Sequence, residues 1–427
     1  MNNKFYKFDF TQRNVAIDIF RALTMFAMIF VNDLGTVNGV PHWLEHSSGG
    51  EDFIGLADYV FPVFLFVVGM SIPFAIERRY SKGASVESTI GHILLRTFAL
   101  LLMGAFISNT INFTQIEGLS LFSPYSLYRI GNSQYSMGVY FILMFVGFIL
   151  VWNQYAPTDD KNLKRLFTVL KFAGMGILLF LAITFRSVNG NVFVACWGGI
   201  LGIIGWTYLL CSFIYIFSRH RLKYLILVWL VFITICILGT NMNEIWGGQA
   251  ILSLPKPNIY NEFLGILRVG NGAYIAFTMG GIILSTLCVK YANMAHRKKI
   301  IFAVISFTVF FLLGVLARKF WILSKLGCTP TWVFHVTATA IAAYAIIYWL
   351  VENGKGSWFN IIKPAGTATL TCYCISHVAY GLAMITGIVL PDRFAYGWIG
   401  ILNCLCFSFV IIGVTQLLGK LNIKLKI

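Results

Sequence analysis

The sequence is poor in charged residues. Only 11% of its 427 residues are Asp, Glu, Lys or Arg, whereas a soluble globular domain carries about 25%. Acidic residues are half as frequent as basic residues, with 16 Asp and Glu against 32 Lys and Arg. Hydrophobic residues make up 58% of the chain. This composition excludes an ordinary soluble protein and favours a chain that crosses a lipid bilayer many times.

Several motifs that would define a chemistry are also missing. The sequence has no Walker loop, no His/Cys set at zinc spacing and no G-x-S-x-G nucleophile elbow. The nine cysteines fall almost wholly in apolar runs. Cys372 and Cys374 are two residues apart, as are Cys404 and Cys406, so on a helix they point to different sides. The sequence therefore predicts no metal site and no disulfide framework, and the cysteines are interpreted as packing residues.

Apolar runs long enough to cross the hydrocarbon layer of about 30 Å recur along the whole chain. Each is expected to form a helix, because lipid offers the backbone no hydrogen-bond partners. We predict an all-α polytopic membrane protein that forms one integral membrane domain, residues 1–427. Its twelve predicted spans are 15–33, 57–76, 93–112, 136–152, 168–186, 193–217, 224–239, 270–289, 300–317, 330–350, 365–389 and 398–418.

Basic residues are unevenly distributed among the segments that connect these spans. With the N-terminus in the cytoplasm, most lysines and arginines, from Lys4 to Lys426, fall on the cytoplasmic side. This is the positive-inside bias of inserted membrane proteins, and it explains the net charge of +16 without a nucleic-acid partner. Both termini are predicted to be cytoplasmic. No cleavable signal peptide is expected, because the first apolar run is full length and lacks a small-residue cleavage site.

Polar residues in the first span stand out, because such groups are costly in lipid unless they are paired or used. Asp18 and Arg21 are three residues apart, and Asn32 follows Arg21 after about three helical turns, so the three lie on one face. There are two simpler interpretations. Asp18 and Arg21 could form a self-neutralising pair that fixes helix packing, and Asn32 could hold helices together.

A polar loop, DLGTVNGVPHWLEHSSGGED, follows the first span and contains no lysine or arginine. His42 and His46 lie in it together with Glu45, Glu51 and Asp52. An acidic pocket would attract a cationic group such as a protonated amine. A carboxylate beside a histidine also holds one tautomer of the ring and raises its basicity. An ordinary solvated loop is the alternative.

Asp58 opens the second span, in GLADYVFPVFLFVVGMS. An aspartate in this position can accept hydrogen bonds from free amides and offset the positive end of the helix dipole. Pro62 is expected to kink the span, and Gly69 to permit the close approach of a helix or a bound chain. Each of these residues could be architectural. Together with Asn32 and His46, they are interpreted as one wall of a pocket.

Polar residues later in the chain give weaker signals. Arg96 stands at the cytoplasmic start of the third span, where it could extend to the interface or bind an anion. Arg129 precedes the fourth span on the outer side. His335 and His377 lie within spans, where a histidine is either a functional candidate or a partner of a neighbouring helix.

The polar start of the chain carries a resemblance to a known family. DIFRALTMFAMIFVN, EHSS and GLADYVFPVFLFVVGMS, within residues 14–79, resemble the N-terminal signature of the heparan-alpha-glucosaminide N-acetyltransferase family. LSKLGCTPTWVF and PAGTATLTCYCISH are more loosely similar to its C-terminal motifs. Members are multi-pass acyltransferases that use cytosolic acetyl-CoA to acetylate a terminal glucosamine across the membrane. The sequence departs from the family where SSGGED follows His46, since a tryptophan usually follows closely, and where the loop after Asn32 is longer.

The resemblance implies roles for individual residues. The essential histidine of the family falls on His46, the asparagine that ends the preceding helix on Asn32, and the aspartate that opens the next helix on Asp58. We expect His46 to act as general base, Asp58 to orient it and Asn32 to stabilise the oxyanion. Acetyl-CoA, the co-substrate, is expected to meet Asp18, Arg21 and Arg96. The acceptor is expected to meet Glu45, Glu51, Asp52, Arg129 and His377.

The sequence thus predicts acetyl transfer from cytosolic acetyl-CoA to an amino-sugar acceptor, either directly or through an acetylated His46. Two alternatives stay open: a secondary transporter of a small solute, and an acetyl-CoA-dependent O-acetyltransferase of an envelope glycan. Against the transporter, the intramembrane charges concentrate at one end of the chain instead of recurring in two matching halves. A homodimer is left open. The resemblance implies the bacterial inner membrane as the location.

Overall fold

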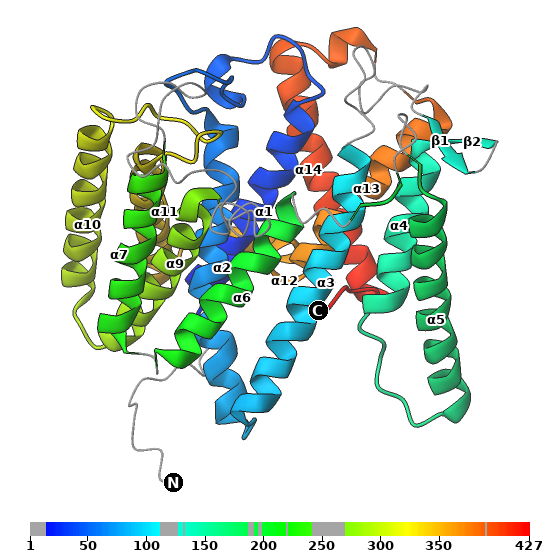
Figure 1. Ribbon diagram of the computed structural model, residues 1–427, viewed down its shortest axis with the longest axis horizontal. Helices are drawn as coiled ribbons and strands as arrows, with labels where there is room; N and C mark the ends of the chain where they lie inside the picture. Colours follow the sequence, from blue (N-terminus) through cyan, green and yellow to red (C-terminus); the bar gives the residue numbers. More distant parts are fainter. Residues whose placement is uncertain are drawn as a thin grey trace. The chain divides into compact units, whose positions relative to one another are not determined.

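The computed structural model of the protein describes residues 14–111, 127–130, 133–186, 192–194, 199–218, 221–240, 270–388 and 391–427. Within these residues, eleven helices are long and apolar enough to cross a membrane, and α4, Met137–Trp152, is a shorter apolar helix. These helices match the predicted spans, so the chain is an α-helical polytopic membrane protein (Figure 1). The cytoplasmic location of the two termini stays a prediction.

The long helices are α1 (Val15–Leu34), α2 (Leu56–Ser81), α3 (Val86–Ile111), α5 (Lys161–Thr184), α6 (Ile200–Phe217), α7 (Leu222–Gly239), α9 (Ala273–Lys290), α10 (His296–Ala317), α11 (Pro330–Glu352), α13 (Thr369–Thr386) and α14 (Gly397–Lys420). Most of the long helices begin and end within a few residues of the predicted limits, but α3 and α5 begin seven residues before the predicted starts at 93 and 168, and α6 begins seven residues after the predicted start at 193. The predicted span 365–389 is divided, because the short helix α12, Lys363–Thr367, is separated from α13 by the cap residue Ala368.

The shorter elements lie between the spans. Strands β1 (Leu127–Ile130) and β2 (Ser133–Ser136) form an antiparallel hairpin directly before α4, which the sequence did not predict. Single turns of 3-10 helix occur at η1 (His42–Leu44), η2 (Gly270–Gly272), η3 (Ser357–Ile361) and η4 (Asp392–Phe394).

The chain forms two compact units. Unit 1 contains Met1–Thr24, Pro41–Thr97 and Ile203–Ile361, and unit 2 contains Met25–Val40, Phe98–Gly202 and Ile362–Ile427. The boundary between them falls inside α1, α3 and α6. The prediction of a single domain over residues 1–427 stays a prediction.

In unit 1, α2 and α9 pack against each other through glycines. A methyl group at Gly69 would overlap the carbonyl oxygen of Thr278 in α9, and one at Gly281 would overlap the carbonyl oxygen of Phe66 in α2. The close approach predicted at Gly69 is therefore confirmed, and its partner is α9. Helix α2 continues through Pro62 from Leu56 to Ser81. This packing fixes the position of the first turn of α2 within the unit.

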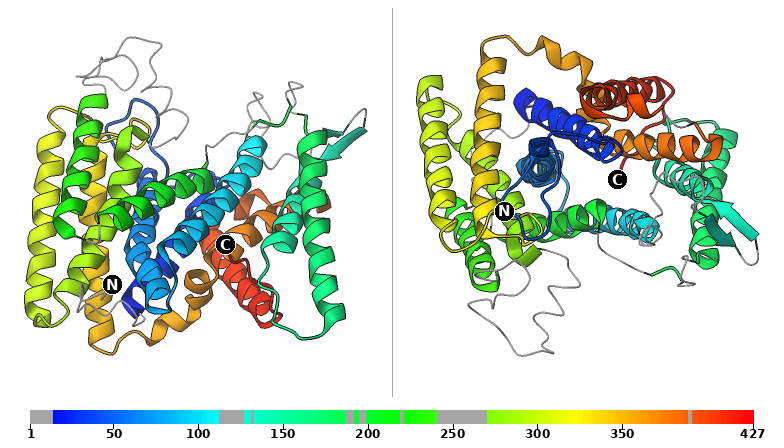
Figure 2. Two further views of the ribbon diagram at one scale, coloured as in Figure 1. Left: turned by 60° about the horizontal axis from the view of Figure 1, so that its bottom comes forward. Right: turned by 90° about the horizontal axis from the view of Figure 1, so that it is seen from above.

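Helix α10 lies at the periphery of unit 1. It packs along α11 (Figure 2) and leaves most of its apolar side chains exposed, among them Ile305, Leu312 and Leu316. An apolar face of this size is expected to contact lipid when it belongs to a membrane span. The core of the unit is formed by buried side chains of α2, α6, α7 and α9, such as Ile76, Tyr215 and Met279.

In unit 2, α4 lies between α5 and α13, and glycines again allow close contact. A methyl group at Gly174 of α5 would crowd the Gly147 carbonyl of α4, and one at Gly138 of α4 would overlap the Gly381 carbonyl of α13. Small residues at such interfaces are typical of packed membrane helices, because they let the backbones approach. The hairpin of β1 and β2 adjoins α4 (Figure 1).

Candidate active site

The loop before α2 folds back onto the first turn of that helix. A methyl group at Gly55 would overlap the carbonyl oxygen of Glu45, so only glycine permits this close approach. Within the loop, His42 stacks on Phe53 at a ring distance of 4.5 Å, and its Nε2 lies 2.8 Å from Glu51 Oε1. The fold of the loop places His46 beside the start of α2.

Asp58 is the centre of the site. His46 Nδ1 lies 2.6 Å from Asp58 Oδ1, and the backbone N–H groups of Ser47 and Gly55 donate to Oδ2 at 2.9 and 3.3 Å. Asp58 therefore does more than start the helix, because it joins the loop, the helix and the histidine. The carboxylate is 1% exposed, whereas the His46 side chain is 53% exposed. The negative charge is thus buried, and the ring reaches water.

Lys325, which is distant in the sequence, contacts both Asp58 and His46. Its Nζ lies 3.2 Å from Asp58 Oδ1 and 3.0 Å from His46 Nδ1, and its side chain is 22% exposed. Burial lowers the pKa of the Lys325 ammonium below its usual value, although the carboxylate of Asp58 acts in the opposite direction. A buried carboxylate is stable only when it is paired. Asp58 has two such partners, His46 and Lys325.

The segment that carries Lys325 is held by its own turn and by α11. Cys328 has a φ of 48° and donates its N–H to the Lys325 carbonyl at 3.0 Å. Thr329 caps α11 by accepting a hydrogen bond from the N–H of Trp332. The fully buried Trp332 ring then donates from Nε1 to the Asp58 carbonyl at 3.3 Å. The start of α11 is therefore fixed directly against the start of α2.

The distances decide which ring nitrogen of His46 carries a proton. A carboxylate oxygen 2.6 Å from Nδ1 requires a hydrogen between the two atoms. Nδ1 therefore donates to Asp58, and the ammonium of Lys325 donates to the same oxygen. In this tautomer the other nitrogen, Nε2, has a free lone pair. A half-exposed histidine in this state is suited to accept a proton from a molecule in the aqueous phase.

The predicted donor-binding residues lie within helices of unit 1. Asp18 Oδ1 lies 3.6 Å from Arg21 Nη2, and Arg21 also donates to Ser71 Oγ of α2 at 3.0 Å. The guanidinium of Arg96 lies 4.6 Å from the centre of the Tyr208 ring. The Asp18–Arg21 pair expected from the spacing is present, and the binding of acetyl-CoA by these residues stays a prediction.

Three other predicted residues belong to unit 2. Asn32 is exposed near the end of α1. His377 of α13 packs between aromatic rings, and its Nδ1 lies 3.0 Å from the Tyr373 carbonyl of the preceding turn. Arg129 falls on β1, and its side chain lies outside the described part of the chain. Their predicted roles are untested by this geometry. His335, in α11 of unit 1, packs against Gly314 and Phe311 of α10.

The carboxylates of the loop have partners of their own. Glu51 accepts from Ser48 N at 2.9 Å and lies against His42, and Asp52 binds Arg318 and the Leu323 N–H. Both residues therefore shape the loop, whereas Glu45 is exposed. Their predicted contacts with an acceptor stay predictions.

Lys325 and Trp332 are site residues that sequence reasoning missed. Both lie in LSKLGCTPTWVF, a stretch that resembles a family motif, so a signal was present. Neither residue stands out by composition, because a lysine in a loop usually has a solvated side chain and a tryptophan at a helix start is usually a packing residue.

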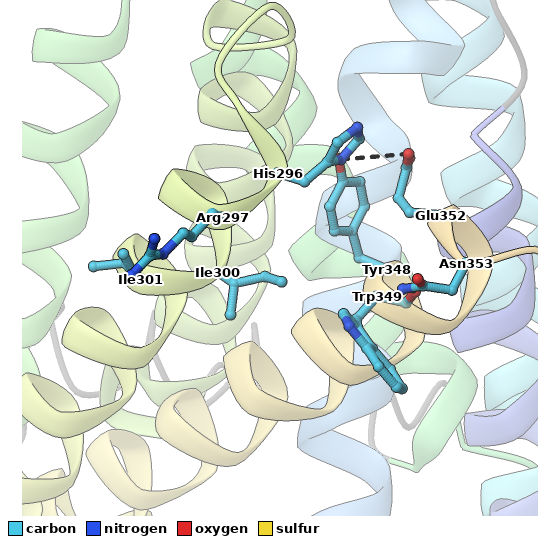
Figure 3. Close-up of a pocket in the computed structure, with 8 residues that line it drawn as sticks. All are labelled: His296, Arg297, Ile300, Ile301, Tyr348, Trp349, Glu352 and Asn353. Atoms are coloured by element: carbon cyan, nitrogen blue, oxygen red, sulfur yellow. Dashed lines mark hydrogen bonds and ion pairs between the residues drawn. The ribbon is translucent and has the colours of Figure 1, made fainter.

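A separate cavity of about 360 Å³ lies at the opposite end of α11 (Figure 3). Its polar side chains bind one another: His296 Nδ1 lies 2.9 Å from the Tyr348 hydroxyl and 3.4 Å from Glu352 Oε2. Ile300 and Trp349 form part of its apolar wall. Helix α11 has 23 residues and so rises roughly 34 Å. The cavity and the His46 group therefore adjoin opposite ends of this helix.

The fold and the site define a polytopic helical membrane protein with a paired histidine and aspartate at one end of a span. Residues 13–122 match the family model described as heparan-alpha-glucosaminide N-acetyltransferase, catalytic. The chain is 35% identical over 94 residues to heparan-alpha-glucosaminide N-acetyltransferase of Mus musculus, and 33% identical over 95 residues to that of Homo sapiens. Each match covers 22% of this chain and 13% of the relative.

These comparisons confirm the resemblance inferred from the first 79 residues. The stretch matched by the family model contains Asn32, His46 and Asp58, whereas Lys325 lies beyond it. The chain spans only a small part of the length of the curated relatives that it matches.

Proposed function

We propose that the protein is a transmembrane acetyltransferase that moves an acetyl group from acetyl-CoA to the amino group of an amino sugar. The observation that carries this proposal is the 2.6 Å contact between His46 Nδ1 and the buried Asp58 Oδ1, inside the stretch that matches the catalytic family model. The names of the two relatives supply the reaction class, N-acetyl transfer.

In the proposed reaction, His46 Nε2 takes a proton from the acceptor amine as its nitrogen attacks the thioester carbonyl. The C–N bond forms and the C–S bond breaks, so that the sulfur leaves as the thiolate of CoA and takes up the proton that His46 received from the amine. Asp58 holds the ring and stabilises the imidazolium that forms in the first step. A second route, in which His46 is acetylated and then attacked by the amine, uses the same atoms. Asn32 is the proposed donor to the oxyanion, on the basis of the resemblance.

The proposed arrangement places the reaction on the outer side of a bacterial inner membrane. Acetyl-CoA is highly anionic at its nucleotide end, which would stay at the basic cytoplasmic side, and its long pantetheine arm would carry the acetyl group inward. Asp18, Arg21 and Arg96 are the proposed contacts of the donor, because cationic and polar side chains within spans suit phosphates and amides. The proposed contacts of the acceptor are Glu45, Glu51, Asp52, Arg129 and His377.

The test is transfer from labelled acetyl-CoA to glucosamine by the purified full chain in detergent. His46→Ala should lower the rate by about 10²–10⁴-fold, the usual contribution of a general base. His42→Ala is the matched control, because His42 lies in the same loop and is similarly exposed, and it should retain activity within about tenfold of the parent.

The outcomes separate the competing functions. Transfer that depends on His46 supports the proposal. If the chain binds acetyl-CoA but acetylates a hydroxyl of a glycan instead of the amine, the O-acetyltransferase is the correct alternative. Absence of both binding and transfer would overturn the acetyl-CoA assignment in favour of a carrier.

A further inference from the structure

Two side-chain nitrogens share one carboxylate oxygen in the His46 site. Asp58 Oδ1 lies 2.6 Å from His46 Nδ1 and 3.2 Å from Lys325 Nζ, while Nζ and Nδ1 are only 3.0 Å apart. Both nitrogens are donors in this arrangement, so the oxygen holds them together against their mutual repulsion. A pair of histidine and aspartate alone favours the charged imidazolium, because an opposite charge stabilises it. A cation at the same oxygen works against that effect.

We propose that Lys325 is a positioning residue of this site that holds His46 as a neutral ring with Nε2 free. With His46 neutral, the charges of Asp58 and Lys325 cancel. When His46 gains a proton, its imidazolium lies 3.0 Å from the ammonium of Lys325. Two like charges at this distance repel each other, and the three side chains together carry a net charge of +1. Lys325 thereby opposes protonation of the ring from solution, while the 2.6 Å contact between Nδ1 and Asp58 Oδ1 keeps the proton of the neutral ring on Nδ1.

The other charged groups around the ring do not provide this balance. From the loop before α2, His42 pairs with Glu51, and Glu45 is exposed. From the segment after α10, Arg318 pairs with Asp52. Glu51 and Asp52 each have a partner of their own and are more exposed than Asp58. Lys325 is thus the cation whose removal changes the charge next to His46.

This inference uses the proposed function only to say why a neutral ring matters. A base must be unprotonated to accept the proton of an amine. The outer side of a bacterial inner membrane is not buffered like the cytoplasm, so a ring that resists protonation would keep the site competent over a wider range of external pH.

The test measures the reaction of each histidine with diethyl pyrocarbonate as a function of pH, with peptide mass spectrometry to identify His46. Only the neutral ring reacts, so the midpoint of the pH dependence reports its protonation without any need for enzymatic turnover. The full chain in detergent is compared with Lys325→Met, Lys325→Arg and Lys319→Met. The last is the matched control, since it removes an exposed cation from the same segment.

We expect Lys325→Met to raise the midpoint of His46 by about one pH unit, which lowers its reactivity about tenfold below both midpoints. Lys325→Arg and Lys319→Met should leave the midpoint within about 0.3 unit, since each keeps a cation beside Asp58. An unchanged midpoint in Lys325→Met would overturn the proposal. If that variant does not fold, Lys325→Gln takes its place with the same expectation. Loss of acetyl transfer in every acceptor assay would sink the proposed function and leave this result standing.

Discussion

Asp52 holds Arg318 through both carboxylate oxygens, with Arg318 Nε at 3.1 Å from Oδ1 and 3.0 Å from Oδ2. The same carboxylate accepts a hydrogen bond from the backbone N–H of Leu323 at 2.7 Å, two residues before Lys325. The loop before α2 therefore binds the segment between α10 and α11, and this contact positions Lys325 beside Asp58.

Loss of the Asp52 carboxylate should loosen that segment without unfolding the protein. The pair is about half exposed, so Asp52→Ala should change the free energy of unfolding by no more than about 1 kcal/mol. Hydrogen exchange of the amides around Leu323 should nevertheless become faster, and acetyl transfer should fall. Asp52→Asn should show a smaller effect, because its side-chain oxygen can still accept from Leu323 N. Unchanged exchange around Leu323 would contradict this structural role, whereas an increase in the KM for the acceptor would support the proposed contact of Asp52 with the acceptor.

Asp58 and Lys325 should be coupled in stability. Asp58→Asn leaves a largely buried ammonium without its carboxylate, and breaking such a buried pair costs about 3–5 kcal/mol. Lys325→Met should be costly for the converse reason. The double variant should be less destabilised than the sum of the single variants, because it removes both charges. Thermal unfolding of the four proteins followed by tryptophan fluorescence gives the coupling, and strictly additive shifts would contradict a direct interaction.

The glycine contact between α2 and α9 should be essential for the position of Asp58. Gly69→Ala forces the methyl group against the Thr278 carbonyl, and overpacking of this kind costs about 1–3 kcal/mol. Gly91→Ala, in α3, is the matched control because its methyl group meets open space. Gly91→Ala should leave the midpoint of thermal unfolding unchanged or raise it slightly, since alanine is the better helix former. Equal losses in thermal stability for both variants would contradict the role of Gly69.

The predicted orientation can be tested with two exposed serines. Ser48 lies in the loop before α2, and Ser357 lies in η3, after α11. We expect Ser48→Cys to react with a membrane-impermeant maleimide from outside intact cells, and Ser357→Cys to react only in inverted vesicles. The parent chain measures the reaction of the native cysteines. The reverse pattern would invert the topology and move the site to the cytoplasm.

The helices could be predicted closely because a membrane span has a simple requirement. A run of about 20 apolar residues has to satisfy its own backbone, so hydropathy alone located every helix that the structure describes as a span. The break at Ala368 escaped prediction, because the interruption between α12 and α13 occurs within one apolar run. The hairpin before α4 was missed for a related reason, since two four-residue strands have too few residues for a clear alternation.

The pair of His46 and Asp58 could be predicted because both residues lie near one another in the sequence and bracket a helix start. Their resemblance to a family signature reinforced the chemical interpretation. Lys325 could not be placed in the same way. It lies 279 residues after His46, and its role depends on Asp52, Arg318 and Trp332, which bring two distant helix starts together. A single sequence contains no distance information of that kind.

The exposure of His46 affects how the proposed reaction can avoid hydrolysis of acetyl-CoA. A ring that is 53% exposed meets water as readily as it meets an acceptor, and a base activates whichever nucleophile lies against it. A thioester bound next to this ring without an acceptor would therefore be hydrolysed by water. Selective acetylation requires the acceptor itself to act as the cover of the site, so that the sugar both receives the acetyl group and keeps water away from it.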